Sequence, residues 1–304
     1  MPGLERILNG VIRFRQTVRK DLVKQFERIR DNPHPTAVFF TCMDSRMLPA
    51  RITSSQVGDM FVVRNSGNMI PHANNYGKIL RRGDTTGKEN REKENWKPRP
   101  FLPPETPRRE DLVEKVIYCA KSPSGYEVSV TTEPAALELA VKRGKINHVI
   151  VCGHSDCKAI NTLYNLHKCP KSFDPESPMD HWLRRHGFNS IRKLEKRLAD
   201  KNAGPIEFVS DNPLFSFSAV IDPEDKLNVE DKLSQINTLQ QLENVASHGF
   251  LKEFLVSQTV DLHAMWFDIY TGEMHMFSKP NKQFVLVDES NVEELIDEVE
   301  KHQT

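Results

Sequence analysis

The stretch TAVFFTCMDSR, residues 36–46, places a thiol, a carboxylate and a guanidinium directly after a strand pattern. Its first part, residues 36–41, is short, apolar and rich in β-branched and aromatic side chains, so it predicts a buried strand. Cys42, Asp44 and Arg46 then follow at alternate positions. Polar side chains at the end of a buried strand indicate a ligand site in a protein of the α/β class.

Further strand patterns along the chain alternate with helical ones. Strands are predicted at 60–65 (MFVVRN), at 148–152, and on both sides of a turn at Thr271-Gly272 within 260–277. Helices are predicted at 132–145 and 233–249, where apolar residues recur at helical spacing. Buried strands that alternate with helices predict an α/β fold with a central, mainly parallel β-sheet flanked by helices.

The composition limits the classes of protein that the chain can belong to. Its 304 residues are 38% hydrophobic, which is enough for a sizeable core, and 42 basic residues balance 42 acidic ones. That balance gives no indication of nucleic acid or an anionic membrane surface as the main partner. No run of 18 apolar residues predicts a membrane span. Five cysteines are a sparse, odd set, which favours an intracellular protein over a disulfide framework.

The first 30 residues form an amphipathic helical pattern rich in arginine. One interpretation is a helix of the mature fold that packs on a neighbour. The other is a mitochondrial import signal, although Glu5, Asp21 and Glu27 interrupt the basic character that such signals show. The compartment therefore stays open between the mitochondrial matrix and the cytosol.

Three segments are rich in proline and charge. Residues 81–110 have few core-forming side chains and predict an exposed, disordered insertion. Residues 168–188 and 200–232 are interpreted as further insertions. No internal repeat divides the chain, so we expect a single domain over residues 1–304 that carries these insertions.

Two cysteines and a histidine have the chemistry of a metal site. In INHVIVCGHSDC, residues 146–157, a predicted strand ends near Gly153 and is followed by His154 and Cys157. Cys42, at the end of another strand, is the candidate for a third ligand. Two thiolates and an imidazole form a set of three zinc ligands, which leaves the fourth coordination position of the metal open. The alternative is a buried thiol beside a histidine in a turn.

Asp44 and Arg46 are candidate catalytic residues beside that metal. Asp44 is close enough in sequence to reach either the metal, as a ligand, or a water molecule on it. Arg46 can hold the Asp44 carboxylate through paired hydrogen bonds, which keeps it ionised and oriented. The alternative is an ordinary ion pair in a turn, which would contribute about 0–1 kcal/mol.

Three segments together resemble the β-class carbonic anhydrases, and most closely their invertebrate members. They are CMDSR (42–46), GDMFVVRNSGN (58–68) and HVIVCGHSDC (148–157). The resemblance implies that Cys42, His154 and Cys157 bind one Zn²⁺ per chain and that Asp44 and Arg46 form a catalytic dyad. It also implies a four-stranded parallel sheet with a fifth strand, and N-terminal helices that clasp a partner in a homodimer or a dimer of dimers. Phe61 and Gly153 are expected at the substrate pocket.

The activity implied by this resemblance is the reversible hydration of CO₂ to bicarbonate and a proton. Zinc-bound hydroxide would attack CO₂, bicarbonate would exchange for water, and the proton would pass to buffer. Two positions depart from the family. Lys158 stands where a glycine is common, and Phe39 stands where the bacterial members under bicarbonate control have tryptophan.

Other functions stay open on the same residues. The chain could hydrolyse another small heterocumulene, such as carbon disulfide or carbonyl sulfide. It could also be an inactive zinc-binding interaction module in which Asp44 closes the site. A thiol redox role for Cys152 and Cys157 is disfavoured, because four residues separate them instead of two. Cys119 and Cys169 lie in or beside insertions and are expected to be dispensable for metal binding.

Overall fold

A computed structural model describes residues 2–73, 131–199, 204–210 and 215–300, and the backbone of residues 120–121 and 127–128. The insertion predicted at 81–110 and Cys119 lie outside these described residues.

A six-stranded sheet forms the centre of the molecule, in the order β10-β9-β8-β5-β1-β2. The strands are β1 (Ala37–Cys42), β2 (Met60–Asn65), β5 (His148–His154), β8 (Asp261–Asp268), β9 (Glu273–Ser278) and β10 (Gln283–Leu286). The strands β2, β1, β5 and β8 run parallel, whereas β9 and β10 are antiparallel to their neighbours. The five predicted strands and the mainly parallel sheet are confirmed. The sixth strand, β10, was not predicted from the sequence; it is short and half-buried.

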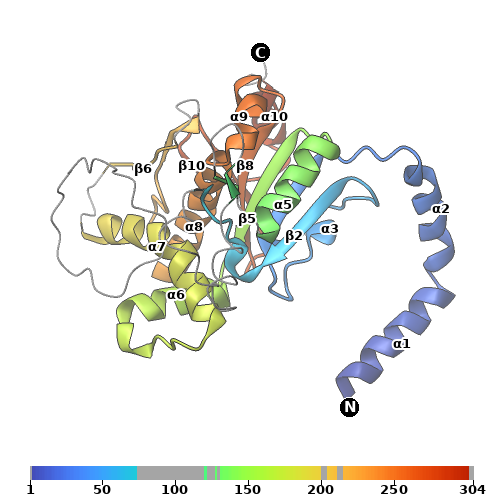
Figure 1. Cartoon of the computed structure of the whole chain (residues 1–304), viewed down its shortest axis with the longest axis horizontal. Helices are drawn as coiled ribbons and strands as arrows, with labels where there is room; N and C mark the ends of the chain where they lie inside the picture. Colours follow the sequence, from blue (N-terminus) through green and yellow to red (C-terminus); the bar gives the residue numbers. More distant parts are fainter. Residues whose placement is uncertain are drawn as a thin grey trace, which may run out of the picture.

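Helices pack around this sheet and extend from it (Figure 1). They are α1 (Pro2–Gln16), α2 (Arg19–Arg30), α3 (Pro49–Ile52), α5 (Thr132–Glu138), α6 (Lys158–Lys168), α7 (Pro178–Ala199), α8 (Val229–Ala246), α9 (Lys252–Val256) and α10 (Val292–Glu300). Single turns are η1 (Ser66–Asn68), η4 (Pro170–Ser172) and η6 (Gly249–Leu251), and η3 (Leu139–Arg143) extends α5 as a π-helix. Two-stranded ribbons pair β3 (Ala120–Lys121) with β4 (Glu127–Val128), and β6 (Ile206–Phe208) with β7 (Phe217–Ala219).

The first 30 residues form two helices, α1 and α2, instead of the one helix predicted. The segments at 168–188 and 200–232, interpreted as insertions, contain regular structure: α7 begins in the first, and the β6–β7 ribbon and the start of α8 lie in the second. Among the described helices, none combines the length and the apolar character that crossing a membrane requires.

The two faces of the sheet differ in how they are covered. The main core lies on the face where Leu233, Ile236 and Leu239 of α8 belong to one cluster with Val149 and Val151 of β5. On the other face, a small cluster of three buried residues is bordered by half-exposed apolar side chains. The buried residues are Phe39, Met47 and Cys152, and the border is formed by Ile52, Met60, Ile150, Met265, Phe267 and Met274.

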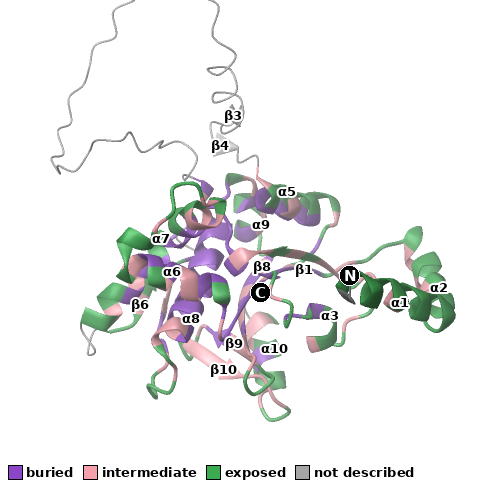
Figure 2. Cartoon of the chain, turned by 90° about the horizontal axis from the view of Figure 1, so that it is seen from below, coloured by how far each residue is buried: buried purple, intermediate pink, exposed green. Residues whose placement is uncertain are grey.

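The N-terminal helices α1 and α2 stand away from this body (Figures 1 and 2). No residue of α2 is buried, and although Leu22 and Ile29 are half-buried, most apolar side chains of this N-terminal segment are exposed. The largest of these are Leu4, Ile7, Leu8, Val11, Ile12, Phe14, Val18, Val23 and Phe26. The fold therefore leaves apolar surface both on these helices and on one face of the sheet.

Candidate metal centre

Three side chains with metal-binding atoms meet where β1 and β5 end. Cys42 is the last residue of β1, His154 is the last residue of β5, and Cys157 follows shortly after it. The two strands are parallel neighbours, with Thr41 in register with Cys152, so their carboxyl ends meet. The ligand atoms of the three residues lie within 4.8 Å of one another, and the two Sγ atoms are 3.7 Å apart. The structure therefore brings together the three predicted zinc ligands.

The hydrogen bonds of His154 leave one ring nitrogen for a metal. Nδ1 lies 2.8 Å from the Ser155 carbonyl oxygen. Because a carbonyl only accepts hydrogen bonds, Nδ1 carries the proton and Nε2 carries the lone pair. Nε2 is buried and has no hydrogen-bond partner. An unpartnered imidazole nitrogen beside two buried thiols fits zinc. The Ser155 carbonyl oxygen accepts from the other ring nitrogen and orients the ring, as hydrogen-bond acceptors do for zinc-bound histidines.

Backbone amides near the two sulfur atoms favour their ionised forms, those of Ala159 and Ile160 at Cys157 and those of Gly67 and Asp44 at Cys42. Cys157 is the N-cap residue of α6, and its side chain makes no capping hydrogen bond.

The two thiols are hydrogen-bonded to each other, with 3.7 Å between their sulfur atoms. This hydrogen bond lowers the pKa of Cys42, whereas the same bond and burial raise the pKa of Cys157. A divalent metal would displace the thiol protons, since thiolates are the metal-binding form.

Helix α8 positions this end of the sheet through buried polar side chains. Ser234 Oγ donates to the His154 carbonyl oxygen at 2.7 Å and accepts from Trp266 Nε1 at 3.1 Å. Asn237 Nδ2 donates to the Gly67 carbonyl oxygen at 3.0 Å. These bonds fix the main chain on both sides of the metal-binding residues. The helix was predicted from sequence, but the role of its polar side chains was not.

The Asp44 carboxylate is held by Arg46 beside the metal-binding residues. Oδ1 accepts from Nε and from the backbone amide of Arg46, both at 2.9 Å, and Oδ2 accepts from Nη2 at 2.7 Å. The hydrogen bonds from the guanidinium hold the pKa of Asp44 well below its usual range. The side chain of Asp44 is only 10% exposed. Both of its oxygens bond to Arg46 here, and the three-residue metal group found among the described residues does not include Asp44.

A second arginine, Arg64 of β2, fixes the main chain of the same segment. Its Nη2 donates to the Asp44 carbonyl oxygen at 2.6 Å, and its Nε donates to the Cys42 carbonyl oxygen at 3.2 Å. The turn that carries the dyad is therefore held from the neighbouring strand.

Phe61 lies at the opposite end of β2 from these residues. It is in register with Val38, whereas Cys42 is in register with Asn65. Four residues of strand, about 13 Å, separate the two positions along the sheet. The Phe61 ring packs near Gly144, where an added Cβ would lie 2.7 Å from Cε2 of the ring. Within one chain, the structure does not bring Phe61 to the metal-binding residues.

Gly153 lies beside His154 and faces α8. A Cβ at this position would lie 2.0 Å from Thr238 Oγ1 and 3.2 Å from Trp266 Cδ1. Only hydrogen fits as its side chain between β5 and α8. The structure thus gives Gly153 a packing role, and its place in a substrate pocket stays a prediction.

The remaining described cysteines lie apart from the metal-binding residues. Cys152 belongs to the small cluster on the other face of the sheet, and burial raises the pKa of its thiol to about 12. Cys169 is exposed after α6. Neither is placed to replace Cys42 or Cys157.

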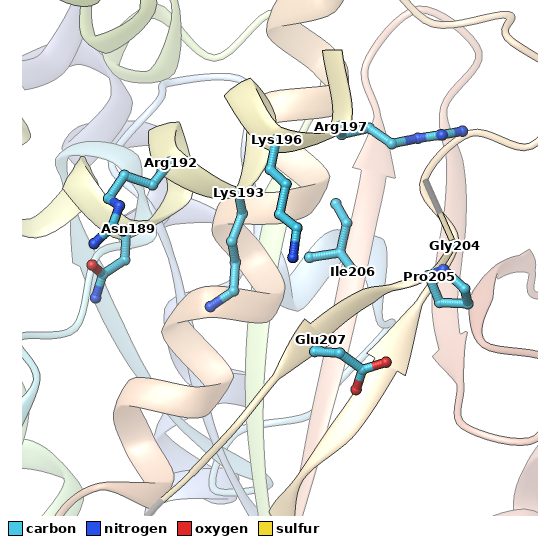
Figure 3. Close-up of a pocket in the computed structure, with 9 residues that line it drawn as sticks. All are labelled: Asn189, Arg192, Lys193, Lys196, Arg197, Gly204, Pro205, Ile206 and Glu207. Atoms are coloured by element: carbon cyan, nitrogen blue, oxygen red, sulfur yellow. The ribbon is translucent and has the colours of Figure 1, made fainter. Parts of the chain in front are cut away.

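A cavity of about 260 Å³ lies between α7 and β6 (Figure 3). Its charged lining is Arg192, Lys193, Lys196 and Arg197 of α7 and Glu207 of β6. The Lys193 ammonium is already paired with Glu243 at 2.9 Å. No metal-binding residue lines this cavity, so it is separate from the site described above.

The structure is an α/β protein with a mainly parallel sheet, and the two cysteines and the histidine at neighbouring strand ends are a set of residues that could hold a metal ion. The family model described as carbonic anhydrase matches residues 37–84 and 124–274. Over 297 residues the chain is 54% identical to "Beta carbonic anhydrase 1" of Caenorhabditis elegans, covering 97% of this chain and 93% of that protein. The Caenorhabditis briggsae protein of the same name is 51% identical over 301 residues, covering 98% and 93%. The chain therefore belongs to the carbonic anhydrase family, in its β class.

Solved structures show the same fold. The β-carbonic anhydrase CcaA superposes with a TM-score of 0.61 at 23% identity, covering 95% of this chain and 93% of that one. A structure described as one of two tetrameric β-carbonic anhydrases from Sordaria macrospora gives a TM-score of 0.54 at 15% identity, covering 91% and 98%. The family resemblance predicted from the three sequence motifs is confirmed.

Proposed function

We propose that this protein is a zinc-dependent carbonic anhydrase that interconverts CO₂ with bicarbonate and a proton. The observation that carries the proposal is the buried group of Cys42, His154 and Cys157, with the unpartnered His154 Nε2 beside two thiols. Membership of the β class supports the reaction type. When bound, one Zn²⁺ per chain would supply a water molecule of lowered pKa as the nucleophile near neutral pH.

The dyad supplies the positioned charge that this chemistry needs. Asp44 remains ionised at neutral pH because Arg46 holds its pKa low. An ionised, oriented carboxylate can accept a hydrogen bond or a proton from a reacting group. The bidentate contact with Arg46 restricts where the carboxylate points. We therefore assign Asp44 and Arg46 as the catalytic dyad, with Asp44 as an alternative metal ligand when Arg46 releases it.

The decisive experiment combines metal analysis with a CO₂ hydration assay on the purified full chain. We expect about one zinc per chain, hydration above the buffer rate, loss of activity on chelation and recovery with zinc. Carbon disulfide and carbonyl sulfide are assayed in parallel. Hydrolysis of either without CO₂ hydration would favour the heterocumulene hydrolase. Zinc at full occupancy with no reaction would favour an inactive binding module.

We further propose a single catalytic domain that assembles as a homodimer, or a dimer of such dimers, through α1 and α2. The support is that the chain has two partly exposed apolar surfaces. One lies on these helices, and the other lies on the face of the sheet that carries Phe39, Met47 and Cys152. Contiguous exposed apolar surfaces commonly mark contacts with another chain. The compartment, mitochondrial matrix or cytosol, depends on whether residues 1–30 also act as an import signal. Fusing them to a fluorescent protein tests that point.

A further inference from the structure

A second carboxylate also binds Arg46. Asp156 lies between the ligands His154 and Cys157, and its Oδ2 accepts from Arg46 Nη1 at 2.8 Å. Its carbonyl oxygen accepts from Arg46 Nη2 at 3.0 Å. The guanidinium thus donates to Asp44 through Nε and Nη2 and to Asp156 through Nη1 and Nη2. A planar group with two carboxylate partners has one orientation in which all of these bonds form.

Asp156 is itself held from several directions. Its amide donates to Asp231 Oδ1 at 2.7 Å, and Asp231 is only 3% exposed. Lys158 Nζ lies 2.8 and 3.1 Å from its two carboxylate oxygens, and Asn161 Nδ2 lies 3.2 Å from Oδ1. The Asp156 carboxylate is therefore oriented by contacts other than the one with Arg46.

The backbone of Asp156 adopts the left-handed conformation, with φ of +50°. Aspartate is one of the few residues besides glycine that populates this region. In this conformation the Asp156 amide reaches Asp231 and its carboxylate reaches Arg46.

We propose that Asp156 is a positioning residue that fixes Arg46, so that Arg46 keeps the Asp44 carboxylate in one orientation beside the metal. Lys158, where the family commonly has glycine, places a positive charge beside the Asp156 carboxylate. This inference rests on the proposed function, because it assigns a role in the same reaction. Asp156 would act on Asp44 through Arg46, and it belongs to the segment that also carries two of the proposed metal ligands.

Two variants test the role of the Asp156 side chain. Asp156→Gly removes the carboxylate and suits a positive φ. Asp156→Asn also tolerates that φ and keeps an acceptor oxygen, but loses the charge. The matched control is Asp225→Gly, since Asp225 also has a positive φ, of +54°, and lies on an exposed turn far along the chain. Loss of a residue that orients a reactive group typically costs 10–100-fold in activity.

The first measurement is a double-mutant cycle on kcat and KM for CO₂ hydration, with zinc content checked for each protein. We expect Asp156→Gly to lower kcat/KM about tenfold at wild-type zinc content, with Asp156→Asn intermediate. In an Arg46→Ala background, Asp156→Gly should have no further effect. An equal loss in both backgrounds, or loss of zinc, would show a structural role and overturn the proposal.

The second measurement does not depend on activity. Hydrogen exchange of the Arg46 Nε–H is followed by NMR in the zinc-loaded protein labelled with ¹⁵N-arginine, and the signal is assigned by its absence in Arg46→Ala. Exchange should be several-fold faster in Asp156→Gly and unchanged in Asp225→Gly. Wild-type exchange in Asp156→Gly would overturn the proposal. If that variant does not fold, Asp156→Asn decides by the same criterion. Should the wild type fail to hydrate CO₂, the proposed function fails while this readout still tests the positioning.

Discussion

The Sγ atoms of Cys42 and Cys157 lie 3.7 Å apart, although the two residues are 115 positions apart in the chain. Parallel pairing of β1 with β5 brings them together, because it places both strand ends at one edge of the sheet. The two buried thiols are close enough to form a hydrogen bond with each other and to bind one ion together. A divalent metal bound to both sulfur atoms would replace the thiol protons.

Replacing either sulfur ligand should remove the metal. We expect Cys42→Ser and Cys157→Ser each to lose most of the bound zinc, measured per chain by elemental analysis after gel filtration. Cys152→Ala and Cys169→Ser are the controls, since one thiol faces the opposite side of the sheet and the other is exposed. Full zinc occupancy in both ligand variants would show that the site is elsewhere.

Replacing Arg46 should separate activity from metal binding. Arg46→Ala leaves Asp44 without its guanidinium partner, so we expect CO₂ hydration to fall by about 10²-fold while zinc stays bound. Asp44→Asn should have an effect of similar size. The control is Arg51→Ala, at an exposed position in α3. Near-wild-type rates for Arg46→Ala with zinc in place would reduce the pair to a surface salt bridge.

The exposed apolar side chains of α1 should matter for assembly. We expect the double variant Ile7→Glu and Val11→Glu to lower the molar mass measured by light scattering after gel filtration. The reason is that charged groups cannot replace apolar ones in a buried contact without a large desolvation cost. Arg6→Gln and Arg13→Gln change the same helix without adding buried charge and should leave the mass unchanged. Equal masses for all proteins would place the contact between chains elsewhere.

The pattern of burial in each element decides whether that element can be predicted from the sequence. Strand β1 is buried along its whole length, so a continuous apolar run identifies it. Helix α8 is also buried nearly all round, but many of its buried residues are polar. Gln241 Oε1 accepts from the Ile70 amide at 2.7 Å, and Asn244 Nδ2 donates to the Ile70 carbonyl oxygen at 2.8 Å. No periodicity in sequence reveals that such side chains bond to a backbone 171 and 174 residues away.

In the metal site, too, some features could be predicted from the sequence and others could not. Cys42, His154 and Cys157 were predictable because metal ligands are few in type and follow strand ends. Asp156 was not singled out, since an aspartate in a turn is usual and its contact with Arg46 depends on the register of β1 and β5. Phe61 was expected at the pocket by resemblance, but strand register places it at the other end of β2. Sequence thus identified the reactive groups, whereas the contacts that orient them required the three-dimensional fold.

Gly153 offers a test of packing beside the metal. Gly153→Ala places a methyl group against Thr238, so we expect the free energy of unfolding to fall by about 1–3 kcal/mol. Adding Thr238→Ala removes the clash and should restore part of that loss, as measured by urea denaturation. Gly204→Ala is the control, because no atom lies within 4 Å of its Cβ position. If the double variant is no more stable than Gly153→Ala alone, the cost does not come from this contact.

Two buried histidines should make the fold sensitive to mild acid. Burial lowers the pKa of His186 to about 4 and that of His248 to about 4, whereas in the unfolded chain both titrate near 6.5. Between these values the unfolded chain binds protons that the folded chain does not, so the free energy of unfolding should rise with pH from 4 and level off above about 6.5. Each histidine contributes at most about 3 kcal/mol over this window.

His186 is the better residue for isolating this effect. Its Nδ1 is buried without a hydrogen-bond partner, and its ring packs edge-on against Trp182 at a centroid distance of 4.4 Å. His186→Leu keeps apolar packing and removes the titrating group, so its stability should depend less steeply on pH than that of the wild type. Urea denaturation at several pH values from 4.5 to about 7 measures the two slopes. The difference between the slopes reports His186, and equal slopes would mean that its ring accepts a proton without unfolding the protein.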